Sequence, residues 1–399
     1  MARVNICFLI LYMGLCTHSN AQSRQIAGQL TDRRAITTAV PFVSFAPDAR
    51  GAALGDAGVA TSPDVNSIHW NNAKLAFIDN DYGFSVAYTP WLGKIVNDMY
   101  VSYVSGYKRI DRLQTVAVSL RYFDLGDIFL RDEFGLDLGV HNPREWAVDA
   151  TYSRKLSERL SIGVTTRFIR SNLSGRFLTS QDAKAGTSVA VDLGVYYTKN
   201  IFFSGKISTI SFGGHISNFG SKVTYSNASN EDFIPTNLRL GAAFKTDLDP
   251  YNSFTFVFDV NKLMVPSPPV IEEDPNNPGV LIRTAGKNPN RSLISGTFGS
   301  FGDAPDGFSE ELKEINFSTG IEYWYKDLAA FRTGYFHESF VKGNRKFITV
   351  GVGFRYQVFG VDFAYLIPTQ QNHPLAETLR FSLLFNFAGK ETVETDPGV

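Results

Sequence analysis

Regular alternation of apolar and polar residues constrains the fold of this chain more than any other feature of its sequence. After Asp81, the side chains of Tyr82, Phe84, Val86 and Tyr88 alternate with small residues, and later segments repeat this period of two. Such alternation is typical of strands with one apolar and one polar face. Fourteen runs show it, at residues 82–89, 98–107, 113–123, 145–154, 160–170, 187–198, 206–217, 236–245, 253–261, 316–325, 328–337, 346–356, 360–367 and 378–388.

The connections between these runs alternate in length. Short turns such as KRIDR, KLSER, KNIFFSG and TDLDPYN follow every second run, and the other connections are longer, up to residues 262–315. An even strand number with short turns at one end and long loops at the other is typical of outer-membrane barrels. A soluble β-sandwich, the alternative, has no reason to sort its loops in this way. We therefore predict an all-β fold, a fourteen-stranded antiparallel transmembrane β-barrel.

The chain begins with the pattern of an exported protein. Residues 1–21 combine Arg3, a short apolar run and a small-residue cleavage site, which predicts a signal peptide. Lipoprotein processing at Cys16 is the alternative. Both cysteines lie in this leader, so we expect no disulfide, zinc knot or thiol nucleophile in the mature chain. A net charge of −1 argues against a nucleic-acid partner.

These patterns divide the chain into four parts. We expect a signal peptide at 1–21, a periplasmic segment with a plug at 22–81, the barrel at 82–388 and a polar tail at 389–399. The expected location is the outer membrane, in contact with its lipids. If the short turns face the periplasm, both termini are periplasmic.

The segment Pro41–Phe77 does not alternate. It places small residues between turn formers, which suits backbone folded tightly in a confined space. We interpret this segment as a plug in the barrel lumen. Its candidate residues are Pro47, Asp48, Arg50, Gly55, Asp56, Gly58, Asn71, Asn72 and Ala73.

The predicted inward faces of the strands carry charges of nearly balanced sign. Charges at membrane depth avoid lipid, and in a wide barrel they pair with each other or with a plug. A polar pathway for a transported molecule is the alternative. The candidate lumenal charges are Arg121, Asp149, Arg167, Asp192, Arg239, Asp259, Glu322, Arg332, Arg355, Asp362 and Arg380.

Motifs for catalysis or metal binding are weak. His69 has no second histidine at a metal-ligand spacing, and no G-x-S-x-G motif occurs. A hydrolase built on His69 is the enzymatic alternative, but acyl transfer needs a positioned nucleophile that the sequence does not offer. We expect no enzymatic activity, no catalytic or metal residues and no cofactor.

The long connection 262–315 is the best candidate for a binding surface. It combines apolar residues that look exposed with prolines that stiffen them, and such segments lose little entropy on docking. A merely variable surface loop is the alternative. The candidate partner-binding residues are Leu263, Met264, Val265, Pro266, Pro268, Pro269, Val270 and Ile271.

Several stretches resemble known families. ARGAALGDAGVATSPDVNSIHWNNAKLAF resembles the N-terminal hatch of FadL-type outer-membrane barrels, although Asn72 replaces a proline of their Asn-Pro-Ala-x-Leu-Ala signature. Residues 259–269, 298–315, 320–338 and 342–368 are similar to the PorV family, FadL-like components of the type IX secretion system of Bacteroidetes. The replacement of the proline puts in doubt a gating bend at this position.

The resemblance to the PorV family implies a fourteen-stranded barrel and a role in protein secretion. It implies that the barrel binds the C-terminal domains of secreted cargo emerging from the translocon barrel and passes them to attachment-complex proteins. A FadL-like channel for hydrophobic small molecules is the alternative. The predicted lumen is charged rather than continuously apolar, which favours the secretion component.

Overall fold

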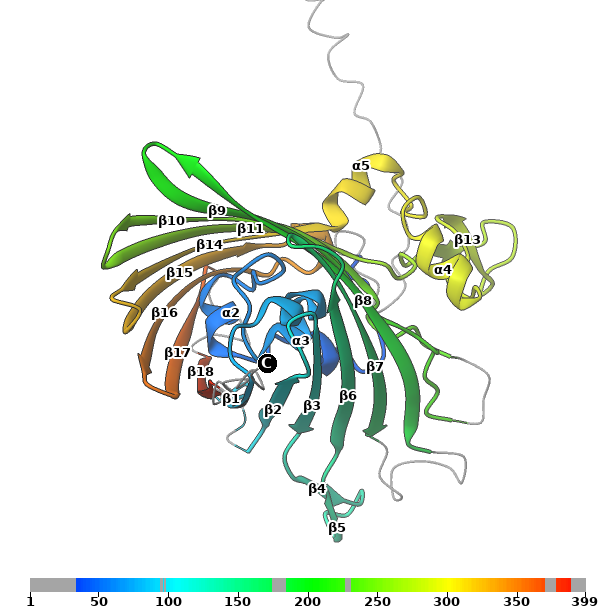
Figure 1. Ribbon diagram of the computed structural model, residues 1–399. Coiled ribbons are helices and arrows are strands. Elements are labelled where there is room, and N and C mark those ends of the chain that lie inside the picture. Colours follow the sequence, from blue (N-terminus) through cyan, green and yellow to red (C-terminus); the bar gives the residue numbers. More distant parts are fainter. Residues whose placement is uncertain are drawn as a thin grey trace, which may run out of the picture.

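The computed structural model describes residues 34–93, 96, 98–173, 184–226, 231–369 and 378–388. Its main feature is a closed antiparallel barrel of fourteen strands, in which each strand pairs with the next along the chain and the last pairs with the first (Figure 1). The predicted fold class is confirmed. The leader, residues 1–21, and the tail, residues 389–399, lie outside the described residues.

The wall strands agree closely with the fourteen alternating runs. They are β1 Tyr82–Pro90, β2 Tyr100–Arg109, β3 Gln114–Asp124, β6 Arg144–Lys155, β7 Leu160–Asn172, β8 Gly186–Phe203, β9 Lys206–Gly220, β10 Asn237–Asp249, β11 Asn252–Leu263, β14 Ile315–Tyr325, β15 Ala329–His337, β16 Lys346–Tyr356, β17 Phe359–Pro368 and β18 Leu379–Phe387. Strands of nine or more residues are long enough to cross a bilayer at a tilt.

Side-chain burial alternates along these strands as the sequence predicts. In β1, exposed and buried residues alternate from Tyr82 to Tyr88, with the large apolar side chains outside. Aromatic rings also meet on the outer surface, where Phe84 of β1 stacks on Phe385 of β18 at 4.6 Å between centroids. Apolar side chains outside and polar ones inside suit a barrel surrounded by lipid.

The barrel has a short-turn end and a long-loop end. The turn between β8 and β9 is Ser204–Gly205, shorter than expected, because strand pairing continues to Phe203 and Lys206. Two of the long connections contain hairpins, β4 Ile128–Arg131 with β5 Asp137–His141 and β12 Val270–Glu273 with β13 Leu281–Ala285. The connection between β11 and β14 also contains α4 Leu293–Gly299, α5 Phe308–Glu311 and η3 Leu312–Glu314, and η4 Phe340–Lys342 joins β15 to β16.

Four short helices precede β1 and lie inside the barrel (Figure 1). They are η1 Pro41–Ser44, α2 Ala49–Ala53, α3 Ser67–Trp70 and η2 Asn72–Phe77. We call residues 41–78, which include them, the inner segment. None of the helices in the described ranges is both long and apolar enough to cross a membrane.

The chain before β1 runs through the lumen from one end of the barrel to the other. At the long-loop end, Arg34 N donates to Val341 O at 2.7 Å and Ala39 N donates to Phe233 O at 2.9 Å. At the short-turn end, Asp81 N donates to Phe387 O at 3.0 Å. The chain therefore enters the lumen at the end opposite to the last strand's end. The sequence analysis placed the segment before the barrel at the short-turn end, and for residues 34–39 this placement is wrong.

Candidate functional site: the filled lumen and the long loops

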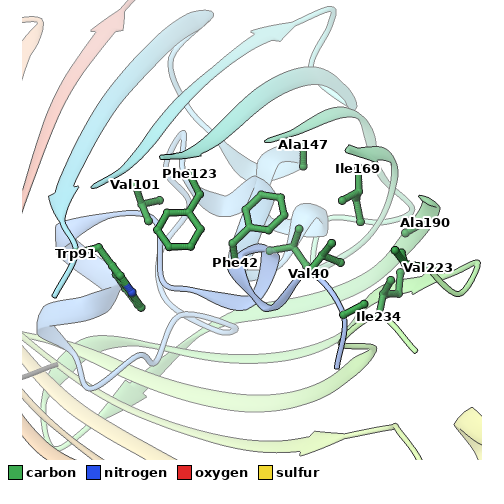
Figure 2. Packing of buried hydrophobic residues seen from close by; sticks show 12 residues of the cluster. Val40, Phe42, Trp91, Val101, Phe123, Ala147, Ile169, Ala190, Val223 and Ile234 are labelled. Atoms are coloured by element: carbon green, nitrogen blue, oxygen red, sulfur yellow. The ribbon is translucent and has the colours of Figure 1, made fainter. Parts of the chain in front are cut away.

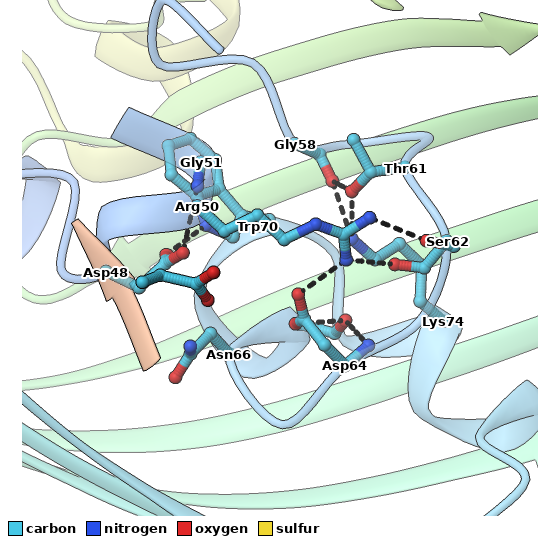
Figure 3. A network of polar contacts seen from close by, with 12 residues as sticks. Asp48, Arg50, Gly51, Gly58, Thr61, Ser62, Asp64, Asn66, Trp70 and Lys74 are labelled. Atoms are coloured by element: carbon cyan, nitrogen blue, oxygen red, sulfur yellow. Dashed lines mark hydrogen bonds and ion pairs between the residues drawn. The ribbon is translucent and has the colours of Figure 1, made fainter. Parts of the chain in front are cut away.

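A chain of ion pairs joins the inner segment to the barrel wall. Arg50 of α2 lies 2.8 Å from Asp64 and 2.8 Å from Glu322 of β14 (Figure 3 shows the Arg50 guanidinium facing Asp64). Glu322 pairs with Arg332 of β15 at 2.6 Å, which pairs with Asp362 of β17 at 2.8 Å. Removing one member of a buried pair leaves the other charge uncompensated. These pairs therefore hold the inner segment against three strands.

A second polar cluster lies on the opposite part of the wall. Arg167 of β7 contacts Asp149 of β6 at 2.6 Å, Asp192 of β8 at 3.0 Å and the amide of Asn218. Arg121 of β3 instead donates to the inner segment, to Phe42 O at 2.9 Å. The sequence identified these arginines by strand parity, and the structure shows that some bind wall carboxylates and others bind inner-segment carbonyls.

All eleven charges predicted to face the lumen do so. Ten are buried and Arg355 is partly exposed, because it lies near the short-turn end and pairs with Asp362 at 2.7 Å. Asp259 accepts backbone N–H bonds from Gly58 at 2.7 Å and Val59 at 3.0 Å. Arg121, Arg239 and Arg380 differ from the other arginines of the set, since none of these three has a carboxylate within 3.5 Å among the described residues. Most of these charges are therefore used in holding the structure together.

The candidate plug residues form the body of the inner segment. Asp48 caps α2 by accepting from Gly51 N at 2.9 Å, and it also accepts from Trp70 Nε1 at 2.6 Å. The nine candidates are all buried except Asp56, which is partly exposed. Pro47, Gly58 and Ala73 bring no charged group. A Cβ at Gly58 would lie 2.5 Å from the Trp70 ring, and a Cβ at Gly163 of β7 would lie 2.6 Å from Ala73 N, so the backbone is closely packed at both places.

Asn72, which replaces the proline of the FadL-type signature, docks the inner segment onto the wall. Its Nδ2 donates to Thr165 Oγ1 at 2.8 Å, and its carbonyl accepts from Ser153 Oγ at 2.6 Å. The neighbouring Asn71 donates to Val195 O at 3.0 Å. A Cβ at Gly194 would lie 2.1 Å from the side-chain oxygen of Asn72, so glycine is needed opposite it. A proline could not make the side-chain bond to Thr165.

Apolar contacts complete the filling of the lumen near the long-loop end. Val40, Phe42 and Val43 pack among inward-facing residues of several strands, including Phe123 and Ile169. Figure 2 shows Phe42 beside Phe123. The Phe42 and Phe123 rings stack at 6.5 Å between centroids. Such a core resembles that of a soluble protein, with the barrel as its outer layer.

The loop between β11 and β14 does not expose the residues that the sequence suggested. Met264 and Val265 are 2% and 3% exposed, so the expectation that they form an exposed surface is wrong. They are buried because Met264 N donates to Thr236 O at 2.8 Å, which holds the start of the loop against the connection between β9 and β10. Pro266 is also buried, Leu263, Pro268, Pro269 and Val270 are partly exposed, and Ile271 is exposed.

Other apolar residues of this loop are exposed instead. They lie on and between β12, β13, α4 and α5, outside the barrel mouth (Figure 1). Isolated exposed apolar side chains are common, but a connection that carries this many is a candidate interaction surface. We call it the loop surface, and it comprises Ile271, Val280, Leu281, Ile282, Ile294, Phe298, Phe301, Phe308 and Leu312.

Buried ion pairs hold this loop and the chain entering the lumen together. Glu310 binds Arg34 and Lys342, at 2.8 and 2.6 Å, and Glu314 binds Lys342 and Lys262 at 2.8 and 2.6 Å. Burial alone would raise the pKa of Glu310, but hydrogen bonds from Arg34 and Lys342 lower that pKa to about 2. The sequence analysis missed this cluster, because its bonded members are distant in sequence, with Arg34 and Glu310 276 positions apart.

His69 has no catalytic surroundings. Its Nδ1 lies 2.9 Å from Arg121 Nη2 and its ring packs edge-on against Trp70, inside the inner segment. Within the ranges that the structure describes, no three His, Cys, Asp or Glu side chains come together in a way that could hold a metal ion. Among the described residues, the groups that contact its ring nitrogens are the guanidinium groups of Arg121 and Arg239.

A wide barrel with a filled lumen and apolar loops defines the class of this protein, an outer-membrane β-barrel of the transport and secretion type. The sequence profile of the PorV family, described as type IX secretion system protein PorV, matches residues 28–270. The chain therefore belongs to the PorV family and is an outer-membrane component of the type IX secretion system. The predicted resemblance is confirmed. The family and the fold are not those of a known class of enzyme.

Comparison with other proteins adds weaker likenesses. No curated protein sequence matches the chain at a significant level. Among solved structures, the Ralstonia pickettii toluene transporter TbuX is 11% identical, with a TM-score of 0.46, covering 86% of this chain and 99% of that one. A Pseudomonas aeruginosa FadL homologue is 12% identical, with a TM-score of 0.47, covering 89% and 100%. The family assignment rests on the sequence profile.

Proposed function

We propose that this barrel is a docking component of the secretion system. It binds the C-terminal domains of cargo emerging from the translocon barrel and delivers them to attachment-complex proteins. The observation that carries the proposal is the contrast between a lumen filled by an ion-paired inner segment and a loop surface that leaves large apolar side chains exposed. A filled lumen does not suit conduction, and an exposed apolar surface suits protein docking.

The proposed orientation follows from the usual arrangement of such barrels. Long loops face the cell exterior and short turns face the periplasm. The loop surface is then extracellular, where cargo emerges, and the outward apolar side chains contact outer-membrane lipids. In this orientation the last strand ends in the periplasm, and Arg34 lies at the extracellular end of the lumen.

Deletion of the gene tests the proposed role. We expect proteins that carry the cargo C-terminal domain to accumulate with this domain uncleaved, measured by immunoblot of cell fractions. Normal release and anchoring of cargo would contradict the proposal. If uptake of an apolar compound failed at the same time, the channel for hydrophobic small molecules would be the better explanation.

Substitutions in the loop surface test the docking site. Ile294 and Phe308 are 66% and 76% exposed, so replacing both with Asp removes apolar surface without opening a core. We expect the variant barrel to assemble and to lose co-purification of cargo C-terminal domains. Phe202, 78% exposed at the short-turn end, is the matched control, and Phe202→Asp should leave capture unchanged. Normal capture by the loop variant would exclude this surface from docking.

A further inference from the structure

The hairpin formed by β8 and β9 extends beyond its neighbours at the short-turn end of the barrel. Pairing of β8 with β7 stops at Tyr197, whereas pairing with β9 continues to Phe203. The last bond on the β7 side runs from Thr198 N to Arg159 O, at 2.9 Å. Residues 199–203 therefore have a strand on one side only among the described residues, and we call their unpaired side the free edge. Figure 1 shows the end of this hairpin well away from β6 and β7.

The backbone of the free edge has hydrogen-bonding groups that no described strand uses. In an antiparallel ladder, alternate residues point their N–H and C=O groups to opposite sides. Because the N–H of Thr198 points to the β7 side, the N–H and C=O groups of Asn200 and Phe202 point to the free edge. Such a row of unpaired groups is a template for another strand, so the chemistry of the edge selects an extended polypeptide.

The position of the free edge is suited to a partner in water. Open sheet edges do not occur where they would face the hydrocarbon region of a bilayer, because their backbone groups would be unsatisfied there. The free edge begins where β8 passes the turn between β6 and β7, which contains the charged residues Glu158 and Arg159. In the orientation proposed above, this end of the barrel is in the periplasm.

The hairpin exposes apolar side chains on both of its faces. Phe202 and Ile207 are paired across the hairpin on one face and are 78% and 63% exposed. Phe203 lies on the other face, where it is 57% exposed and meets Phe244 of β10 edge-on at 5.6 Å between ring centroids. Natural proteins commonly protect edges with charges or prolines, and residues 199–203 contain one charge, Lys199. A strand added here would cover apolar surface as well as backbone.

The charge of the hairpin favours an acidic partner. Residues 198–210 contain Lys199 and Lys206 and no Asp or Glu. Asp249 of β10 acts electrostatically on Lys206, whereas no carboxylate of the described residues forms an ion pair with Lys199. A second copy of this chain would bring the same lysine to the edge and no acid. An acidic segment of a different protein is therefore the better match.

We propose that the free edge of β8 binds an extended segment of a different protein as an added strand. The backbone groups of Asn200 and Phe202 form the hydrogen bonds, and the segment carries apolar side chains and an acidic side chain that meets Lys199. The free edge lies at the end of the barrel opposite to the loop surface. The proposal therefore goes beyond the docking of cargo, and either proposal can fail without the other.

Peptide binding by the full-length barrel in lipid nanodiscs tests this proposal. The probe is an eight-residue peptide of alternating valine and threonine with one central glutamate, and its control is the same peptide methylated on every backbone nitrogen. Isothermal titration calorimetry should show saturable binding of the probe. The methylated peptide should bind at least about tenfold more weakly, because it has no N–H donors. Equal binding of the two peptides, or no saturable binding of the probe, would overturn the proposal.

Two substitutions at one position separate pairing of the backbone from effects of the side chain. Asn200→Pro removes an N–H that points to the free edge and none that β9 uses, so probe binding should fall about tenfold or more. Asn200→Ala keeps this N–H and should bind the probe as the wild type does. Both variants lose the same side-chain bond from Thr209. Equal binding by the two variants, in barrels that keep their heat-modifiable gel mobility, would contradict pairing at this edge.

Hydrogen exchange of the wild-type barrel distinguishes the possible occupants. The amides of Asn200 and Phe202 should exchange rapidly in the barrel alone and slowly with the probe bound, whereas the amide of Ile201, which points to β9, should be protected in both states. Exchange that stays rapid with the probe bound would contradict the proposal. Protection without the probe would also overturn it. In that case, dependence on barrel concentration would identify a second copy, and loss of protection on deletion of residues 389–399 would identify the tail of the same chain.

Discussion

The inner segment buries most of its side chains, whereas the loop surface leaves its large apolar side chains exposed. Inside the barrel, Arg50 has carboxylates on both sides and even small residues are in close contact with the wall. On the loop between β11 and β14, Phe308 is 76% exposed. The difference indicates that the inner segment serves the stability of the barrel, whereas the loop surface keeps apolar area for a partner.

The two regions are nevertheless connected. The chain that enters the lumen passes beneath the long loops, and Arg34 binds Glu310 of α5 at 2.8 Å. Glu310 also binds Lys342 of the next long connection at 2.6 Å. The base of the loop is therefore held by buried ion pairs, as the inner segment is. The exposed apolar side chains lie on the outer part of the loop. Substitutions should show where one region ends and the other begins.

The largest effect is expected in the lumen. Glu322→Ala would leave Arg50 and Arg332 without their shared carboxylate, and breaking a buried pair typically costs about 3–5 kcal/mol. This cost is measured as the change in the free energy of unfolding in urea, with heat-modifiable gel mobility as the readout of folding. Glu133→Ala, an exposed loop charge, should change it by less than about 0.5 kcal/mol. Equal effects would show that the lumenal pairs do not stabilise the barrel.

A smaller effect is expected where the inner segment touches the wall without charge. A Cβ at Gly334 of β15 would lie 2.1 Å from Gly55 N, so Gly334→Ala must displace the inner segment. Overpacking of this kind typically costs about 1–3 kcal/mol. Gly106→Ala is the matched control, because its Cβ would meet nothing closer than 3.5 Å. Similar unfolding midpoints for the two variants would mean that the inner segment shifts to accommodate the added methyl group at little cost in stability.

The sequence predicted the strands of the barrel wall better than the contacts inside the lumen, and the reason is physical. A period of two persists along most wall strands, including β6 and β15, so residues such as Asp149 and Arg332 could be assigned to the lumen by parity alone. Which charges pair depends on strand register and on the path of the inner segment, and neither is visible in local patterns. Met264 illustrates the limit in the loops, because an apolar residue beside prolines has the same sequence pattern whether it is buried or exposed.

Acid should weaken the base of the loop. The pKa of Glu310 is lowered to about 2 in the folded protein from an ordinary value of 4.5. Its contribution is therefore complete above about pH 4.5 and is lost as the pH falls towards 2. The amides of Arg34 and Ala39 bond to loop carbonyls, and their protection factors, which correct the hydrogen-exchange rate for its intrinsic pH dependence, should fall over this range.

The variant Glu310→Gln provides the control for this pH dependence. It should exchange rapidly at Arg34 and Ala39 at every pH, because the amide cannot replace the ion pairs with Arg34 and Lys342. If the protection factors of the wild-type amides were equal at pH 5 and pH 2.5, the ion pairs of Glu310 would not be what holds the entering chain to the loop.

The smallest change in stability is expected at the outer part of the loop. The prediction there compares two apolar residues that are seven positions apart. Ile271 is 37% exposed and Met264 is 2% exposed, although both belong to the same proline-rich stretch. Ile271→Asp should shift the unfolding free energy by less than about 0.5 kcal/mol. Met264→Asp buries an unpaired carboxylate and should increase protease cleavage of the loop. If Ile271→Asp alone lowers capture of cargo C-terminal domains, the loop surface acts by contact. If both variants lower capture only in proportion to cleavage of the loop, capture depends on the folded shape of the loop rather than on its exposed apolar side chains. The loop surface would then not differ from the lumen in this respect.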